Sequence, residues 1–271
     1  MSPPNRLVLA VTAVACLSLT ACQDDREPSA ATPPSTTSSP SSSSPTPSDE
    51  SSQASPALDD AAETFLDRLE RGMGSRGTAH MEMTVGGRAA STASGDMRYG
   101  GRGSELHLTT RTPRLGKGEL EMVVLRDAAY LSLPGVTRPG TFIRIGKDNP
   151  RFEQLAGASI RMSPDESVKA FRAGLVSVED RGRDTVHGVP TTRYDVEVDS
   201  ARALKAQGSD VVPGMPDTLT YGVWLDAQDR MRRMALAMQG VRLRIDLSRW
   251  GRPVDISAPP RSQVVKPPPG F

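Results

Sequence analysis

The sequence predicts an α+β domain in which a large, mostly antiparallel sheet turns one apolar face toward a few covering helices. Three observations predict this class. Apolar residues recur at helical spacing near the start of the domain. Beyond them, apolar and polar residues alternate in many short runs bounded by Gly, Pro or Asp, as in antiparallel strands with one buried face. Proline-led helix starts interrupt these runs.

The first helix is predicted from one apolar stripe. Its members fall at i, i+4, i+7, i+8 and i+11, namely Leu58, Ala62, Phe65, Leu66 and Leu69. The pair Ser55-Pro56 suits an N-cap followed by a first-turn proline. Gly72 and Gly74 predict the end of this helix.

Alternating runs then predict strands. In the first of them Ala79, Met81, Met83 and Val85 alternate with polar residues. Further runs cover residues 105–108, 120–124, 129–133 and 143–145, then 193–199, 221–225, 234–238 and 241–247. Short turns join the last three runs, so they predict consecutive antiparallel strands in a meander.

Three helical segments lie between the two groups of strands or among the later ones. Ser163-Pro164-Asp165-Glu166 forms a capping box with proline at the first helical position, and Val168, Phe171 and Leu175 supply one apolar face. Asn149-Pro150 starts a short helix that carries Phe152 and Leu155, and residues 200–207 predict another.

A sheet of about ten strands tends to curl. Helices must fill its concave apolar face, or the face borders a cavity for an apolar ligand. Periodicity alone leaves both alternatives open. Methionine is flexible and suits a pocket for irregular acyl chains, and several methionines fall on this face: Met81, Met83, Met122, Met234 and Met238.

The N-terminus indicates secretion and lipid attachment. Arg6 precedes an apolar run over residues 7–19 that is too short to span a bilayer, and small residues lie just before Cys22. The stretch Leu19-Thr20-Ala21-Cys22 is similar to a bacterial lipobox, in which the cysteine thiol receives lipid and becomes the first residue after cleavage. We therefore expect a signal peptide over 1–21 and a lipidated Cys22 on the extracytoplasmic face of the cell membrane.

Composition divides the rest of the chain. Residues 22–56 are rich in Ser, Thr and Pro and predict a disordered tether, residues 57–265 predict the folded domain, and 266–271 a short tail. The formal net charge of +1 favours no nucleic-acid partner. The two cysteines are Cys16, inside the signal, and Cys22, so the domain has no thiol for a disulfide or a cysteine metal site, and we expect a monomer.

Catalytic motifs are absent from the sequence. His80, His107 and His187 lie apart, with no His-Glu-x-x-His spacing, and no Gly-rich phosphate loop occurs. Gly157-Ala158-Ser159 lacks the closing glycine of a nucleophile elbow. We therefore expect no enzyme, no metal and no cofactor.

Three segments of the domain resemble a known family. They are His187-Gly188-Val189-Pro190 to Val198, Met215-Pro216-Asp217 to Asp226, with Val223-Trp224-Leu225-Asp226 as the clearest match, and Trp250-Gly251-Arg252-Pro253 to Pro260. In this order they resemble the actinobacterial LppX/LprAFG-like lipoproteins. The resemblance implies a LolA/LolB-like half-barrel, a curved antiparallel sheet wrapped around helices with an apolar cavity between. It also implies binding of acylated lipid or glycolipid, and its carriage or retention at the cell envelope.

Two functions follow as alternatives. The first is a membrane-anchored lipid carrier whose cavity is lined by Met83, Met122, Val223, Leu225, Leu236, Leu243, Phe65 and Phe171. The second is a non-catalytic envelope sensor or interaction module on the same scaffold, with a small or filled cavity. Seven arginines lie in or next to the last predicted strands: Arg230, Arg232, Arg233, Arg242, Arg244, Arg249 and Arg252. We expect them to form the solvated face of edge strands, and the alternative is a surface that contacts anionic lipid headgroups.

Overall fold

A computed structural model of the chain describes residues 60–73, 77–87, 90–100, 104–116, 118–161, 164–211 and 214–268. The predicted signal peptide (1–21), tether (22–56) and Cys22 lie outside the described residues. The helices are α1 (Asp60–Met73), α2 (Pro150–Arg161), α3 (Pro164–Gly174) and α4 (Ser200–Ala206). The strands are β1 (Gly77–Gly86), β2 (Ser91–Tyr99), β3 (Glu105–Arg111), β4 (Leu120–Val124), β5 (Ala128–Ser132), β6 (Phe142–Gly146), β7 (Leu175–Val186), β8 (Val189–Asp199), β9 (Thr218–Asp226), β10 (Met231–Met238), β11 (Val241–Ser248) and β12 (Val264–Val265).

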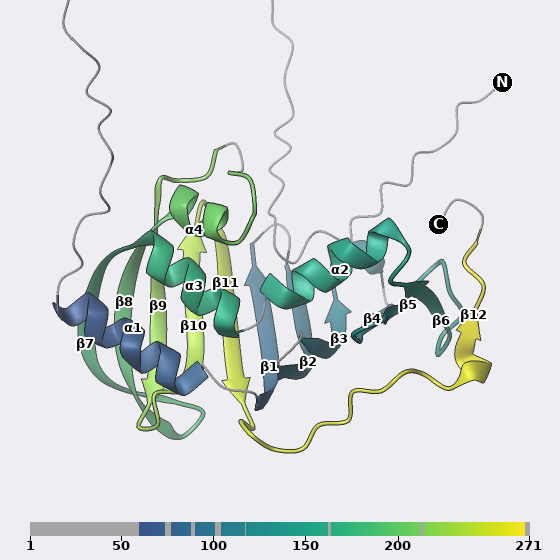
Figure 1. Cartoon of the computed structure of the whole chain (residues 1–271), viewed down its shortest axis with the longest axis horizontal. Helices are drawn as coiled ribbons and strands as arrows, with labels where there is room; N and C mark the ends of the chain where they lie inside the picture. The colour runs from purple at the N-terminus through teal and green to yellow at the C-terminus, as the bar shows by residue number, and fades with distance from the viewer. Residues whose placement is uncertain are drawn as a thin grey trace, which may run out of the picture. The chain divides into compact units, whose positions relative to one another are not determined.

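These strands form one twelve-stranded sheet in the described part of the chain, in the order β12-β6-β5-β4-β3-β2-β1-β11-β10-β9-β8-β7 (Figure 1). Two meanders, β1–β6 and β7–β11, join where β1 pairs with β11. Every neighbouring pair is antiparallel except β12 and β6. The sheet has two ends, β12 and β7, so it does not close into a barrel.

Most predicted elements are confirmed. The last three apolar runs are the meander β9–β10–β11. Three strands were missed: β2 is built of small and polar residues, β7 carries a run of charged residues in its middle, and β12 has only two residues. Leu175 was predicted to belong to the apolar face of the helix that is α3, but this helix ends at Gly174 and Leu175 is the first residue of β7. Gly72 lies inside α1 instead of ending it.

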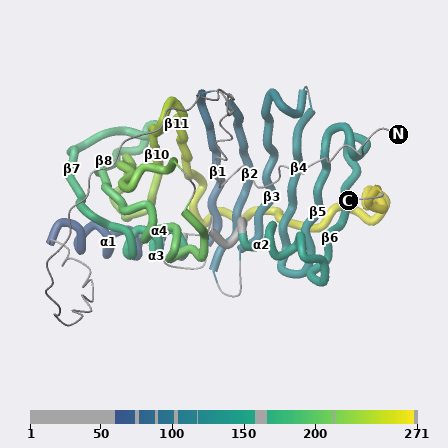
Figure 2. Tube along the Cα trace, turned by 90° about the horizontal axis from the view of Figure 1, so that it is seen from above, coloured from purple at the N-terminus to yellow at the C-terminus, as the bar shows by residue number. Residues whose placement is uncertain are grey.

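The helices lie along one side of the sheet (Figure 2). The apolar stripe of α1 is buried: Ala62, Phe65, Leu66, Leu69 and Met73. Gly72 lets α1 approach the β9–β10 turn, because a Cβ at this position would lie 1.9 Å from the carbonyl oxygen of Asp229. At its β7 end the sheet curves around α1 and α3 (Figure 1).

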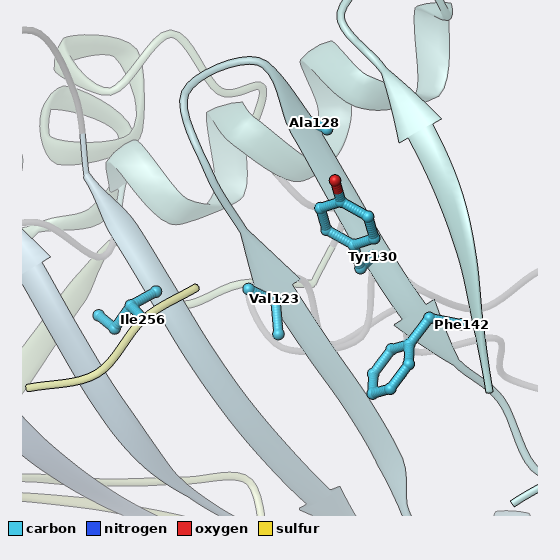
Figure 3. Packing of buried hydrophobic residues seen from close by; sticks show 5 residues of the cluster. All are labelled: Val123, Ala128, Tyr130, Phe142 and Ile256. Atoms are coloured by element: carbon cyan, nitrogen blue, oxygen red, sulfur yellow. The ribbon is translucent and has the colours of Figure 1, made fainter. Parts of the chain in front are cut away.

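The chain after β11 covers part of the opposite, outer side of the sheet. Ile256 packs with Val123, Ala128, Tyr130 and Phe142 (Figure 3). Two hydrogen bonds from side chains to backbone carbonyls attach this segment to β1 and β2. Thr78 Oγ1 donates to the Arg252 carbonyl, and Arg98 Nη2 donates to the Val254 carbonyl. Every residue of β5 is buried: Ala128 and Tyr130 belong to this outer cluster, and Ala129 and Leu131 point to the helix-facing side.

The predicted fold class is therefore confirmed: an α+β domain with a large, curved, antiparallel sheet wrapped around a few helices. The sheet has twelve strands where about ten were expected. None of the described helices combines the length and the hydropathy needed to cross a membrane.

Candidate functional site

The strand register places the six predicted strand residues of the site on the helix-facing side of the sheet. Met83 pairs with Ile245, which pairs with Met234, and Met234 pairs with Val223. Leu236 pairs with Leu243 in the next row, and Leu225 follows Val223 at the alternating position on β9. The side of Met122 follows from three further pairs: Met81 of β1 lies opposite Gly95 of β2, Gly95 lies opposite Leu108 of β3, and Leu108 lies opposite Met122 of β4. Directly paired residues point to the same side of a sheet.

The two predicted helix residues fill one end of this face. Phe65 of α1 lies 5.3 Å from Tyr194 of β8 and 6.4 Å from Phe171 of α3, measured between ring centroids. Phe171 in turn meets Tyr221 of β9 edge to face at 5.6 Å. Because Phe65 and Phe171 are both buried, α1 and α3 pack directly on β8 and β9.

A different environment begins at β10. Seven apolar side chains on the helix-facing side of three adjacent strands are only partly buried, although Val223, Leu225 and Met83 beside them are buried. We call these seven residues the central band: Val85 of β1, Met234, Leu236 and Met238 of β10, and Val241, Leu243 and Ile245 of β11. Met122 of β4 is also partly exposed.

The predicted site residues therefore fall into two groups. Leu236 and Leu243 belong to the central band and Met122 lies on the same face three strands beyond β1. Val223, Leu225 and Met83 are buried in the core, as are Phe65 and Phe171. The structure brings the two groups together on one surface, but only the first group offers apolar area to a ligand without rearrangement.

Charged residues gather on the outer side of the same strands. Asp226 is buried and accepts hydrogen bonds from Arg230 Nε at 3.0 Å and from Arg232 Nε at 2.7 Å. Burial acts to raise the pKa of Asp226, but the bonds from Arg232 and from the backbone of Arg230 and Gln228 outweigh it and lower the pKa. Asp226 thereby orders the β9–β10 turn.

Asp246 is a second buried, ion-paired carboxylate on the outer side, within β11. Burial acts to raise its pKa, and hydrogen bonds from Arg233 and His187 lower it below the ordinary value. Arg233 and Arg193 also stack on Trp224, 5.8 and 5.2 Å from the ring. Trp224 Nε1 donates to Asp184 at 2.7 Å, so the β7–β8 hairpin contacts the outer side of β9.

The interpretation of the arginines as an edge-strand surface is wrong. Strands β10 and β11 lie inside the sheet, with β9 and β1 beside them. Arg230, Arg232, Arg233 and Arg244 form ion pairs with Asp226 or Asp246. The sequence contained both aspartates, but pairing across strands depends on a register that no linear spacing reveals.

The histidines also lie on the outer side. His107 contacts Glu121 and His187 contacts Asp246. His80 Nδ1 lies 2.7 Å from Asp96 Oδ1, and His80 Nε2 lies 3.3 Å from Ser94 Oγ. An aspartate, a histidine and a serine are connected in the same way in the catalytic triad of a hydrolase.

This triad-like group lacks support for acyl transfer. Ser94 is in β2, whose backbone pairs with β1 and β3 on both sides, so its N–H groups are engaged in the ladder. Glu82 lies directly opposite Ser94, and its negative charge would disfavour an oxyanion there. Within the described ranges, no group of three or more His, Cys, Asp or Glu side chains is placed to hold a metal ion.

Comparison with solved structures identifies the architecture. LprF from Mycobacterium bovis aligns with a TM-score of 0.53 and 16% sequence identity, over 74% of this chain and 98% of LprF. The Mycobacterium tuberculosis lipoprotein LppX aligns with a TM-score of 0.52 and 14% identity, over 72% of this chain and 99% of LppX. The domain has the fold of LprF and LppX. No family model and no curated protein sequence matches the chain.

The segment Val223-Trp224-Leu225-Asp226, which carries the sequence resemblance to LppX/LprAFG-like lipoproteins most clearly, has a structural explanation. Val223 and Leu225 are core residues beneath the helices. Trp224 is covered by two arginines on the outer side, and Asp226 binds the turn that follows. The four residues thus connect both sides of the sheet and the β9–β10 turn, and the fold predicted from the resemblance is confirmed.

Proposed function

We propose that this protein is a lipoprotein, anchored through Cys22 on the extracytoplasmic face of the cell membrane, that binds acylated lipid or glycolipid and carries or retains it at the envelope. The central band is the observation that supports this proposal. It presents partly exposed apolar side chains in the middle of a sheet whose flanks are buried, which is where a ligand would complete the packing.

The chemistry of the central band suits acyl chains. All seven side chains are apolar, and two are methionines, Met234 and Met238, which adapt to irregular chains. Each methylene moved from water to such a surface contributes about 0.8 kcal/mol, so a long acyl chain binds without a charged partner. The shared fold with the lipoprotein LppX agrees with this proposal.

A second function is favoured by the packing of α1 and α3. Phe65 and Phe171 occupy the β8–β9 part of the face, as expected for a module with a filled interior that senses or binds another envelope component. The two functions differ in whether the remaining part, over β10, β11 and β1, takes a ligand.

Two measurements on the purified protein separate these functions. Organic extraction followed by mass spectrometry should yield co-purified lipid, and a fluorescent acyl lipid in vesicles should transfer to the protein. Extracts without lipid, together with absence of transfer, would replace the carrier with the sensor or interaction module.

A further inference from the structure

Tyr221 brings an oxygen atom into an otherwise apolar surface. It lies on β9, opposite Val196 of β8 and Leu236 of β10. The helix-facing side chains in regular register on β9, β10, β11 and β1 are apolar with this one exception: Leu219, Val223, Leu225, Met231, Met234, Leu236, Met238, Val241, Leu243, Ile245, Leu247, Ala79, Met81, Met83 and Val85. Tyr221 therefore marks the border between the packed β8–β9 end and the central band.

The ring and the hydroxyl of Tyr221 have different surroundings. The ring packs edge to face on Phe171, with 5.6 Å between centroids and an interplanar angle of 76°. The residue as a whole is only partly buried. Among the described residues no hydrogen bond to its hydroxyl is formed, and burial raises the pKa of this phenol, so the group remains protonated and able to donate.

Tyr194 on the neighbouring strand shows the usual arrangement. Its hydroxyl accepts a hydrogen bond from Arg68, which also donates to Asp229 Oδ1 at 2.6 Å. A tyrosine hydroxyl that a bound ligand shields from water needs such a partner, because an unpaired polar group then costs about 1–3 kcal/mol. Tyr221 lacks an equivalent cation or carboxylate in the described part of the fold, and its hydroxyl borders the surface proposed to hold acyl chains.

We propose that the Tyr221 hydroxyl donates a hydrogen bond to an ester carbonyl of the bound lipid and thereby favours ester-linked acyl chains over ether-linked chains of equal length. This inference rests on the proposed lipid-binding function. An ester carbonyl is uncharged, accepts without donating, and lies directly at the head of an acyl chain, so it can accept from this hydroxyl in place of water without bringing a charge into the apolar face.

Two ligands and two variants test this inference. The probes are dioleoylglycerol, with two ester carbonyls, and dioleyl glycerol ether, which has chains of the same length and no carbonyl. Tyr221→Phe removes only the hydroxyl and keeps the ring on Phe171. Tyr130→Phe removes a hydroxyl from the cluster on the outer side and is the matched control.

The unmodified protein should bind the diester roughly 2- to 10-fold more tightly than the diether, the range expected of one neutral hydrogen bond. Tyr221→Phe should lose this preference through weaker diester binding, with diether affinity and melting temperature unchanged. Tyr130→Phe should keep the preference.

Equal affinity for both probes in the unmodified protein, or a Tyr221→Phe variant that keeps the preference, would overturn the role of Tyr221 and leave lipid binding intact. If the unmodified protein binds neither probe, the proposed function fails, and the role of Tyr221 fails with it.

Discussion

Arg233 and Asp246 lie directly opposite each other on β10 and β11 and form a two-point ion pair, with Nε 2.6 Å from Oδ1 and Nη2 3.2 Å from Oδ2. This geometry matches the planar fork of a guanidinium to a carboxylate. His187 and Arg244 contact the same carboxylate, at 3.1 and 3.4 Å. On β10 and β11 the outer side of the sheet is thus held by paired charges, while the helix-facing side is apolar.

Asp246 should make the stability of the domain depend on acidic pH. Its pKa is lower in the folded protein than the unfolded value of about 3.9, so its contribution is complete above that value and is lost as the pH falls through the folded pKa. Asp246→Asn should therefore reduce the free energy of unfolding at pH 7 by about 1–3 kcal/mol. The same substitution should also reduce the difference in the free energy of unfolding between pH 7 and pH 3.

Urea unfolding at the two pH values measures this effect. The exposed Asp255, in the segment after β11, is the control position, and Asp255→Asn should leave the pH dependence as it is. A difference between pH 7 and pH 3 in the Asp246→Asn variant as large as in the unmodified protein would contradict the role assigned to Asp246.

Much of the fold was predictable because burial leaves a period in the sequence. The alternation in Met81 and Met83 or in Leu243 and Ile245 gave the strands of the interior, where one face meets the helices. Strand β7 was missed for the opposite reason. It is an end strand of the sheet and most of its residues are exposed, so no alternation of buried and exposed residues marks it.

Contacts that depend on tertiary structure could not be predicted. The sequence placed Tyr221, Val223 and Leu225 on one apolar face, and the register confirms that placement. That Val223 is buried while Leu236 opposite Tyr221 is partly exposed depends on where α1 and α3 lie. Packing of Ile256 on the outer cluster depends on the path of the chain after β11.

Leu236 and Val223 should respond differently to tryptophan. Leu236 is partly exposed, so Leu236→Trp should extend over the central band and reduce transfer of a fluorescent acyl lipid several-fold while the protein stays folded. Val223 is fully buried, so Val223→Trp overfills the core and should cost about 1–3 kcal/mol or more of stability.

Lipid transfer and thermal melting of the same variants check this expectation. Arg242→Glu alters an exposed residue on the outer side of β11, next to Leu243 in sequence, and should change neither quantity. Normal transfer by a folded Leu236→Trp variant would remove Leu236 from the ligand surface.

Ile256 should attach the segment after β11 to the sheet. Its side chain is buried among Val123, Tyr130 and Phe142, so Ile256→Ala should lower the free energy of unfolding by about 2–5 kcal/mol. Val265→Ala, at an exposed apolar residue of β12, should change it by no more than about 0.5 kcal/mol. Equal effects of the two substitutions in urea unfolding would show that the outer cluster contributes little.

Cys22 should be the site of lipid attachment. It follows Leu19-Thr20-Ala21 at the end of the predicted signal peptide, and the chain contains one other cysteine, Cys16, inside that signal. Cys22→Ser should therefore abolish incorporation of a fatty-acid analogue into the protein in cells and release it from the membrane fraction. Cys16→Ser is the matched control and should keep both, because it alters a thiol that cleavage removes. Continued labelling of the Cys22→Ser variant would exclude the proposed anchor and, with it, the assignment of the protein as a lipoprotein.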